Sequence, residues 1–201
     1  MSTVAEYPTG YEYPSGGFPK DLTWDEFLAL PYELRNASLV DGEVVVNRPN
    51  AQHEWIVRNL ILVFADWTRA APDRGQVSTQ QAVKINDRRG YQPDFAWYPQ
   101  ELCAPKGEKR KFSGLPGLVV EVLSPSTRAY DLVRKRRDYE AIGIGEVWFV
   151  EQDVDRYGIV ACQRQDADAG FGDTEFKVGD RLASRLLDGF DLDVADVFRD
   201  D

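Results

Sequence analysis

The sequence predicts an α/β (α+β) fold in which helices flank a mixed central sheet. Two segments, 117–123 and 146–151, are almost wholly apolar, as expected of central strands buried on both faces. Apolar residues 56, 60, 63 and 67 recur at helical spacing. The order of elements, namely helix, hairpin, helix, strands, helix and strand, is typical of a sheet covered by helices.

The N-terminal part begins with an arm and continues into a helix and a hairpin. Residues 1–20 are rich in Tyr, Pro and Gly without periodicity, and we expect a flexible arm there, followed by a single domain over 21–201. Thr23 and Glu26 form a capping box, which predicts a short helix through Leu30. Residues 38–48 alternate around Asp41-Gly42, which predicts a hairpin.

A long helix and a strand follow. Asn50 is a suitable N-cap for the helix that carries the apolar stripe, and this helix should end before Pro72. Residues 76–86 then alternate as one strand would. The remaining expected elements are a short strand at 93–98, a loop at 99–115, a helix from the 124–127 turn to 142, peripheral strands at 156–164, 174–178 and 181–186, and a last helix at 194–198.

Composition narrows the class of protein. The longest clean apolar run, 60–65, is too short to span a bilayer, and residues 1–19 lack the pattern of a signal peptide. Cys103 and Cys162 form no metal or redox motif; a disulfide stays open, while reduced thiols fit a cytoplasmic protein. The net charge of −10 argues against indiscriminate, tight nucleic-acid binding, although a site that binds Mg²⁺ requires local carboxylates.

Glu121 lies in the middle of the apolar strand at 117–123. A carboxylate in a central strand is costly unless a cation or hydrogen-bond donors compensate its charge. The alternatives are an edge strand, or a pairing with a purely structural Lys or Arg. Asp94 opens the next short strand upstream, and the two strands could pair. Two carboxylates that converge from adjacent strands make a hard-oxygen site suited to Mg²⁺.

Lys135 falls on one face of the predicted 124–142 helix together with Leu132, Tyr139 and Ile142, while Arg134 and Arg137 point away. A lysine on an inward face requires a negative partner, for which Asp131, Glu121 or a bound phosphate are candidates. The alternative is an aliphatic stem that carries its amine out to solvent.

Together these three side chains suit metal-assisted phosphodiester hydrolysis. Asp94 and Glu121 hold the metal, which lowers the pKa of a bound water and screens the phosphate. Lys135 orients or deprotonates the water, or stabilises charge in the transition state.

The chain resembles the Uma-two family of bacterial restriction endonucleases, a branch of the PD-(D/E)XK nucleases. The resemblance covers about residues 22–198. It is carried by the segments 39–43, His53 with its helix, 92–94, 120–127, Tyr130-Asp131, Lys135, Tyr139 and 143–150. The run Glu-Val-Leu-Ser-Pro-Ser-Thr at 121–127, followed by Asp and Lys, is the most specific part.

The resemblance implies a restriction-endonuclease-like fold, dependence on Mg²⁺ with Mn²⁺ as a substitute, a DNA substrate and a homodimer. It makes Asp94 and Glu121 metal ligands, with the main-chain carbonyl of Val122 as a third. Two departures stand out. Leu123 occupies the usual lysine position, so the lysine is placed at Lys135 instead. Ser38 occupies the position of an auxiliary acid, which Glu43 could replace only if the hairpin faces the site.

Further residues are auxiliary candidates. His53, the single histidine, could contact a phosphate or simply begin its helix; Ser124 and Asp131 are also candidates. Arg88, Arg89 and the basic residues at 106, 109, 110 and 111 could steer a polyanion or form ordinary solvated loops.

Three functions compete. The first is a Mg²⁺-dependent DNA endonuclease. The second is a catalytically silent dimeric interaction module that keeps the nuclease fold, which the net charge and the missing auxiliary acid favour. The third, hydrolysis by a carboxylate pair as in glycosidases, leaves an inward lysine without a role.

Overall fold

The computed structural model describes residues 17–31, 34–79, 81–105, 112–125, 127–166 and 169–200. Its contacts divide the chain into two compact units, unit 1 with residues 1–48 and 82–92, and unit 2 with residues 49–81 and 93–201. Most of the predicted arm and the basic cluster at 106–111 lie outside the described residues. The single domain over 21–201 stays a prediction, and each unit is described by itself.

Unit 1 is a small antiparallel sheet with one short helix. Its strands β1 (Ala37–Val40), β2 (Glu43–Val46), β4 (Val83–Asn86) and β5 (Arg89–Tyr91) are ordered β2-β1-β5-β4. The predicted hairpin is confirmed, and its turn residues Asp41 and Gly42 have φ of 52° and 89°, as a two-residue hairpin turn requires. The capping box is also confirmed, although α1 (Trp24–Leu28) ends before Leu30.

Unit 2 is built on a six-stranded mixed sheet with the order β10-β9-β8-β7-β6-β3. Strands β7 and β8 are parallel and the other neighbours are antiparallel. The strands are β3 (Gln76–Ser78), β6 (Phe95–Tyr98), β7 (Leu118–Leu123), β8 (Glu146–Glu151), β9 (Gly158–Arg164) and β10 (Phe171–Lys177). Every residue of β7 and β8 is buried, so the two apolar segments are central strands as predicted.

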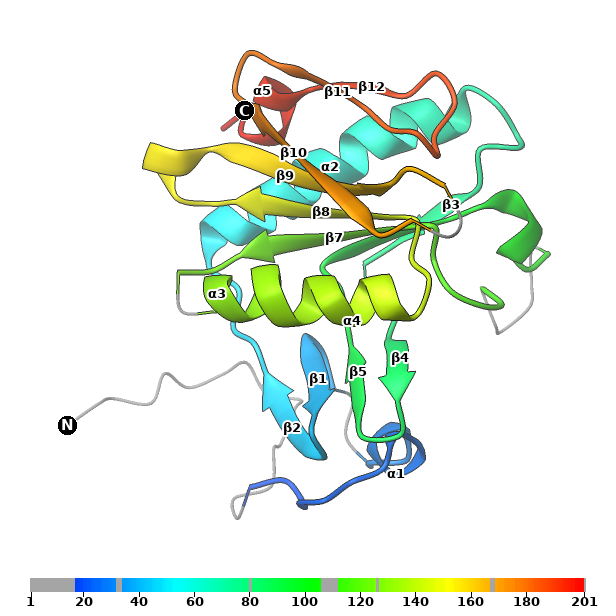
Figure 1. Cartoon of the computed structure of the whole chain (residues 1–201), viewed down its shortest axis with the longest axis vertical. Helices are drawn as coiled ribbons and strands as arrows, with labels where there is room; N and C mark the ends of the chain where they lie inside the picture. Colours follow the sequence, from blue (N-terminus) through cyan, green and yellow to red (C-terminus); the bar gives the residue numbers. More distant parts are fainter. Residues whose placement is uncertain are drawn as a thin grey trace. The chain divides into compact units, whose positions relative to one another are not determined.

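Helices cover both faces of this sheet (Figure 1). On one face, α2 (Ala51–Arg69) buries Ile56, Leu60 and Phe64 against alternate side chains of β6–β9. The hairpin of β11 (Arg181–Ala183) and β12 (Asp191–Asp193), with α5 (Val194–Val197), completes that core. On the other face lies a helical segment of three parts, α3 (Arg128–Tyr130), the π-helical turn η2 (Asp131–Lys135) and α4 (Arg136–Ala141). Two 3₁₀ turns, η1 (Gln100–Leu102) and η3 (Val154–Arg156), lie in loops.

Several predicted elements require correction. The single strand at 76–86 is wrong: β3 and β4 belong to different sheets, because alternation says nothing about which neighbour a strand pairs with. Strand β5 was not predicted, since its Arg-Gly-Tyr sequence is too short to show a period. The strands expected at 156–164, 174–178 and 181–186 are β9, β10 and β11, with shifted ends. Among the described residues, no helix is long and apolar enough to cross a membrane.

Candidate active site

Pairing of β6 with β7 places Asp94 beside Glu121. The last paired residues are Phe95 and Val120, so Asp94 stands one step further, opposite Glu121. Asp94 is near enough for its negative charge to raise the pKa of Glu121, in addition to the larger effect of burial. Strand β7 has neighbours on both sides, which contradicts the edge-strand alternative for Glu121.

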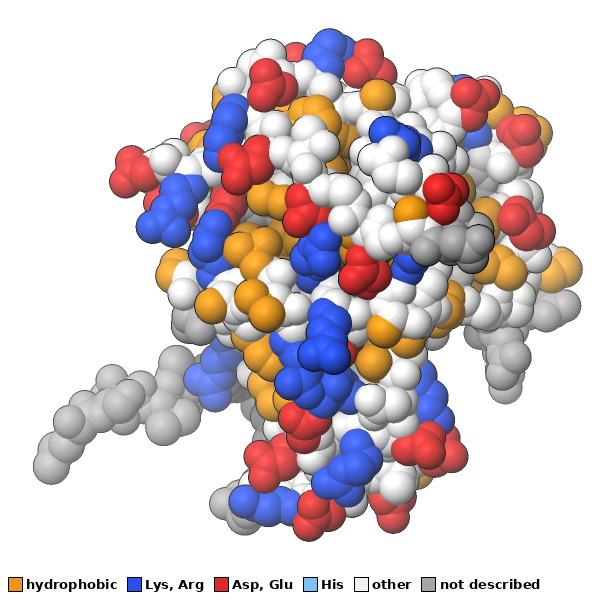
Figure 2. Space-filling model, in the orientation of Figure 1, with side chains coloured by type: hydrophobic (Ala, Val, Ile, Leu, Met, Phe, Trp, Pro, Cys, Tyr) orange, Lys and Arg blue, Asp and Glu red, His pale blue; other side chains and the backbone are white. Residues whose placement is uncertain are grey.

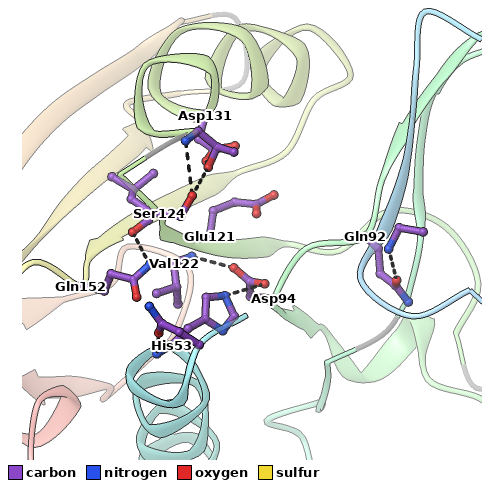
Figure 3. A network of polar contacts seen from close by, with 12 residues as sticks. His53, Gln92, Asp94, Glu121, Val122, Ser124, Asp131 and Gln152 are labelled. Atoms are coloured by element: carbon purple, nitrogen blue, oxygen red, sulfur yellow. Dashed lines mark hydrogen bonds and ion pairs between the residues drawn. The ribbon is translucent and has the colours of Figure 1, made fainter. Parts of the chain in front are cut away.

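The carboxylate of Asp94 joins a helix to the sheet. Its Oδ2 accepts a hydrogen bond from the main-chain N–H of Val122 at 2.8 Å, and its Oδ1 lies 3.1 Å from Nε2 of His53. Figure 3 shows Asp94 between the imidazole and the main chain of β7. His53 lies in the first turn of α2 and also touches Asp94. Its site role stays a prediction.

Glu121 is held by two donors from the helical segment. Its Oε2 lies 2.7 Å from Nζ of Lys135, and its Oε1 accepts a hydrogen bond from the hydroxyl of Tyr139 at 2.7 Å. The residue is 3% exposed. Sequence reasoning placed Tyr139 on the inward face but gave its hydroxyl no partner; its spacing of four from Lys135 is the signal that could have found this contact.

The inward position of Lys135 is confirmed. The residue is 5% exposed, which contradicts the alternative of an amine carried out to solvent. Besides Glu121, Nζ contacts Oδ1 of Asp131 at 3.1 Å. Two of the candidate partners are therefore both in contact with Lys135.

Asp131 is itself fixed by a chain of hydroxyl groups. Its Oδ2 accepts a hydrogen bond from Oγ1 of Thr127 at 2.7 Å, and this hydroxyl lies 2.7 Å from Oγ of Ser124. Ser124 is thus linked to the lysine through Thr127 and Asp131. Thr127 was not singled out from the sequence, because a hydroxyl in a turn carries no pattern beyond a cap.

Asp131 and Lys135 are four residues apart, a spacing that places side chains on one side of a helix, and both lie within the π-helical turn η2. The N–H of Arg136 bonds to the carbonyl of Asp131, five residues earlier. The buried residues of the segment are 131, 135, 138 and 139, whereas the predicted stripe contained 128, 132, 135, 139 and 142. Ideal α-helical spacing therefore gave the correct orientation for Lys135 and Tyr139; Asp131 lay outside the predicted stripe, although its pairing with Lys135 was one of the predicted contacts. Such π turns occur frequently at functional sites.

The local electrostatics are dominated by buried carboxylates. Burial, together with the negative charges of Asp94 and Asp131, raises the pKa of Glu121 to about 7, against the opposing effect of Lys135. Burial disfavours the charged form of Lys135, but Glu121 and Asp131 outweigh it and raise the pKa of its ammonium. For His53, burial is likewise outweighed, chiefly by Asp94, so its pKa is raised. The site therefore attracts cations.

Two buried polar atoms near this network lack partners. Nδ1 of His53 and Oε1 of Gln152 have no hydrogen bond among the described residues, whereas Nε2 of Gln152 donates to the carbonyl of Leu123 at 2.8 Å. Gln152 was not predicted, because a single amide after a buried strand gives no signal in the sequence.

The remaining candidates lie in unit 1. Glu43 is exposed on β2 and lies 3.5 Å from Lys20, and its auxiliary role stays a prediction. Arg88 bonds to Asp21 at 2.9 Å, and Arg89 bonds to Asp41. Arg88 lies in an exposed turn, as expected of an ordinary charged loop, whereas Arg89 belongs to β5 and its side chain is largely covered.

The donor set fits a magnesium ion better than a transition metal. Within the described parts of the chain, no group of three or more His, Cys, Asp or Glu side chains is arranged to hold a metal by itself. Magnesium commonly uses only one or two carboxylates and keeps several waters. Asp94, just before β6, and Glu121 on β7 supply two carboxylates; burial, and then the negative charges of Asp94 and Asp131, raise the pKa of Glu121, and a bound cation would favour its charged form.

Comparison with known proteins identifies the family. A family model described as "Putative restriction endonuclease" matches residues 24–195, which is most of the chain. The chain belongs to the Uma2 family. The resemblance inferred from residues such as Glu121 and Lys135 is thereby confirmed, and Uma2 membership supports a nuclease function in general.

A solved structure supports the fold assignment. The chain is similar to a protein from Anabaena variabilis ATCC 29413 that is described as a putative nuclease belonging to DUF820. The TM-score is 0.71 at 16% identity, with 88% of this chain and 97% of that chain covered. The predicted α/β class and nuclease-like architecture are therefore confirmed. A search of curated proteins gave no significant match.

Proposed function

We propose that this Uma2 protein is a Mg²⁺-dependent endonuclease that hydrolyses phosphodiester bonds in DNA, with Mn²⁺ as a substitute metal. The observation that carries the proposal is the buried contact of 2.7 Å between Lys135 and Glu121, one strand away from Asp94. A purely structural salt bridge would not need the second carboxylate at 94 or the cation-attracting field around both.

The metal would be held by the carboxylates of Asp94 and Glu121 and by the main-chain carbonyl of Val122. When bound, the ion supplies Lewis-acid polarisation and positive charge for hydrolysis of a phosphodiester. The hydrogen bond from the N–H of Val122 keeps the Asp94 carboxylate in place on the sheet. His53 supports Asp94 from the start of α2.

Lys135 acts on the reacting phosphate or water. Because its pKa is raised by two buried carboxylates, its amine stays protonated at neutral pH. A permanently charged ammonium suits stabilisation of the negative charge that develops in the transition state, rather than removal of a proton. Tyr139 orients Glu121 through the bond to Oε1.

Nicking of a supercoiled plasmid tests this function. Purified protein with Mg²⁺ or Mn²⁺ should convert the plasmid to nicked and linear forms, and Asp94→Ala and Glu121→Gln should abolish the conversion. Glu175→Ala, which changes an exposed carboxylate on β10, is the matched control and should cleave as wild type does. Equal nicking by wild type and Asp94→Ala would refute the enzymatic function.

A second candidate is a catalytically silent dimeric module with the nuclease fold. The net charge of −10 favours it, and acidic and basic side chains are interspersed on the viewed face of unit 2 (Figure 2). Calorimetric titration with Mn²⁺ separates the two functions. Saturable binding that Glu121→Gln removes favours the nuclease, whereas no heat of binding favours the silent module.

The assembly and location follow from the same proposal. We expect a cytoplasmic homodimer, in which each copy would cleave one strand of the duplex. Size-exclusion chromatography with light scattering measures the mass directly, and a monomer of 22.8 kDa at all concentrations would contradict the dimer.

A further inference from the structure

Lys135 has two buried counter-ions where one would neutralise it. Glu121 and Asp131 lie 2.7 Å and 3.1 Å from its Nζ, and all three residues are at most 5% exposed. The ammonium can therefore move away from Glu121 and still keep an ionic contact with Asp131. A buried charge left without any partner would be strongly destabilised.

A metal that binds Glu121 would share its carboxylate with two donors. Lys135 contacts its Oε2 and Tyr139 donates to its Oε1, so both carboxylate oxygens are engaged. A cation that binds Glu121 competes with the ammonium for the same oxygen, and two positive charges on one carboxylate oxygen repel each other. A metal at Oε2 would therefore weaken the contact between Lys135 and Glu121.

Asp131 is positioned to hold the ammonium of Lys135. Its Oδ1 already touches the ammonium, and its Oδ2 is fixed by the Thr127 hydroxyl at 2.7 Å. The π turn η2 places Asp131 beside Lys135 on the buried side of the segment. In Figure 3, Glu121 lies between Asp131 and Asp94, so a lysine drawn toward Asp131 leaves Glu121 on the side of Asp94.

We propose that Asp131 is a positioning residue that takes over the Lys135 ammonium when Glu121 engages the divalent cation, and so sets the metal affinity of the site. This inference rests on the proposed function. It assigns Asp131 no contact with metal or substrate; its effect passes through Lys135 alone, and Thr127 contributes by orienting the carboxylate.

A double-mutant cycle with Mn²⁺ tests this coupling. Calorimetry on the full chain should give roughly tenfold weaker Mn²⁺ binding for Asp131→Asn than for wild type, because the ammonium of Lys135 then loses the carboxylate at 131 and is held more tightly by Glu121. In the Lys135→Met background no ammonium competes with Mn²⁺ for the Glu121 carboxylate. The same Asp131→Asn change should then alter the affinity for Mn²⁺ less than about twofold. An equal loss in both backgrounds would mean that Asp131 acts as a general negative charge, and would overturn the proposal.

Two variants at Thr127 leave the charges of the site unchanged, so they test the proposal even if the charge variants misfold. Thr127→Val removes the hydroxyl that orients Asp131, and should weaken Mn²⁺ binding about threefold, while Thr127→Ser keeps the hydroxyl and should bind as wild type. Equal affinities for Thr127→Val and wild type would also count against the proposal. Failure of wild type itself to bind Mn²⁺ would refute the metal site and this inference together, whereas wild-type binding with an unchanged Asp131→Asn would refute the inference alone.

Discussion

At the scale of single residues, the site depends on how buried charges compensate one another. Asp94, Glu121 and Asp131 bring three carboxylates together, against Lys135 and a His53 whose pKa is raised. Such a cluster has a net attraction for cations. Removal of the permanently charged Lys135 should therefore lower the activity of the site. The two predictions at this scale follow from that imbalance.

Lys135→Met should lower the rate of plasmid nicking by about 10²–10³-fold, because the variant loses a preorganised positive charge in a buried site. The reduction should persist at saturating Mn²⁺, since the metal cannot replace a donor at another position. Arg137→Met, an exposed change on the same segment, should reduce the rate less than about threefold. Nicking by Lys135→Met at the wild-type rate would remove the lysine from the mechanism.

The pH dependence of metal binding should follow Glu121. The pKa of Glu121 in the folded protein is about 7, above the ordinary pKa of a carboxyl group. Protonation of Glu121 therefore stabilises the metal-free fold. This stabilisation is complete at a pH below the ordinary carboxyl pKa and is lost as the pH rises through about 7. Mn²⁺ must displace that proton. Calorimetry should therefore show tighter binding at about pH 8 than at about pH 6, with proton release near neutrality. Affinity independent of pH over this range would contradict the assignment of Glu121 as a ligand.

At the scale of elements, the sequence predicted what depends on local pattern. The apolar run at 118–123 gave the central strand, Asp41-Gly42 gave the hairpin, and Asn50 gave the start of α2. The pairing of β6 with β7 was a hypothesis that the register confirms. The predictions that failed concern strand pairing and the π turn, which the local pattern does not show.

The failures at 76–86 and at Asp131 have different physical causes. Alternation in 76–86 is the same whether the residues form one strand or two, and only tertiary pairing separates β3 from β4. Asp131 was excluded from the inward stripe by ideal α spacing, because a π turn is not visible as a period over five residues.

The π turn itself can be tested by deletion. Val133 is 71% exposed within η2, so its removal takes away little packing, but it shortens the spacing between Asp131 and Lys135 from four residues to three and should displace the Lys135 ammonium from Glu121. We expect at least about a 10²-fold loss of nicking with little change in helix content by circular dichroism. Val133→Ala is the control and should cleave within about twofold of wild type. Full activity of the deletion variant would show that η2 is dispensable.

Glu146 anchors the 184–186 loop to the buried end of β8. Its Oε1 accepts hydrogen bonds from Oγ of Ser184 and from the N–H groups of Arg185 and Leu186, at 2.7 to 3.1 Å, and its Oε2 accepts from the Trp148 indole. Glu146→Ala should therefore lower the free energy of unfolding by about 3 kcal/mol in urea denaturation. The exposed Glu175→Ala should change it by less than about 0.5 kcal/mol. Equal stabilities would show that the loop amides find other partners.

At the scale of the whole molecule, charge limits how the protein meets DNA. A net charge of −10 leaves few phosphate contacts, so binding without a divalent metal should be weak, with a Kd of roughly 10⁻⁴–10⁻⁶ M for any duplex at physiological salt. Fluorescence anisotropy with a labelled duplex measures this value. Nanomolar binding in the presence of a chelator would show that phosphate contacts, and not the metal, govern affinity.

The most direct test of the metal site is a crystal structure of the protein soaked in Mn²⁺, with anomalous scattering used to locate the ion. We predict one strong peak in contact with the carboxylates of both Asp94 and Glu121, with the amine of Lys135 beside Asp131. Absence of a peak at these carboxylates in a crystal saturated with Mn²⁺, or a peak bound elsewhere in the chain, would contradict the account.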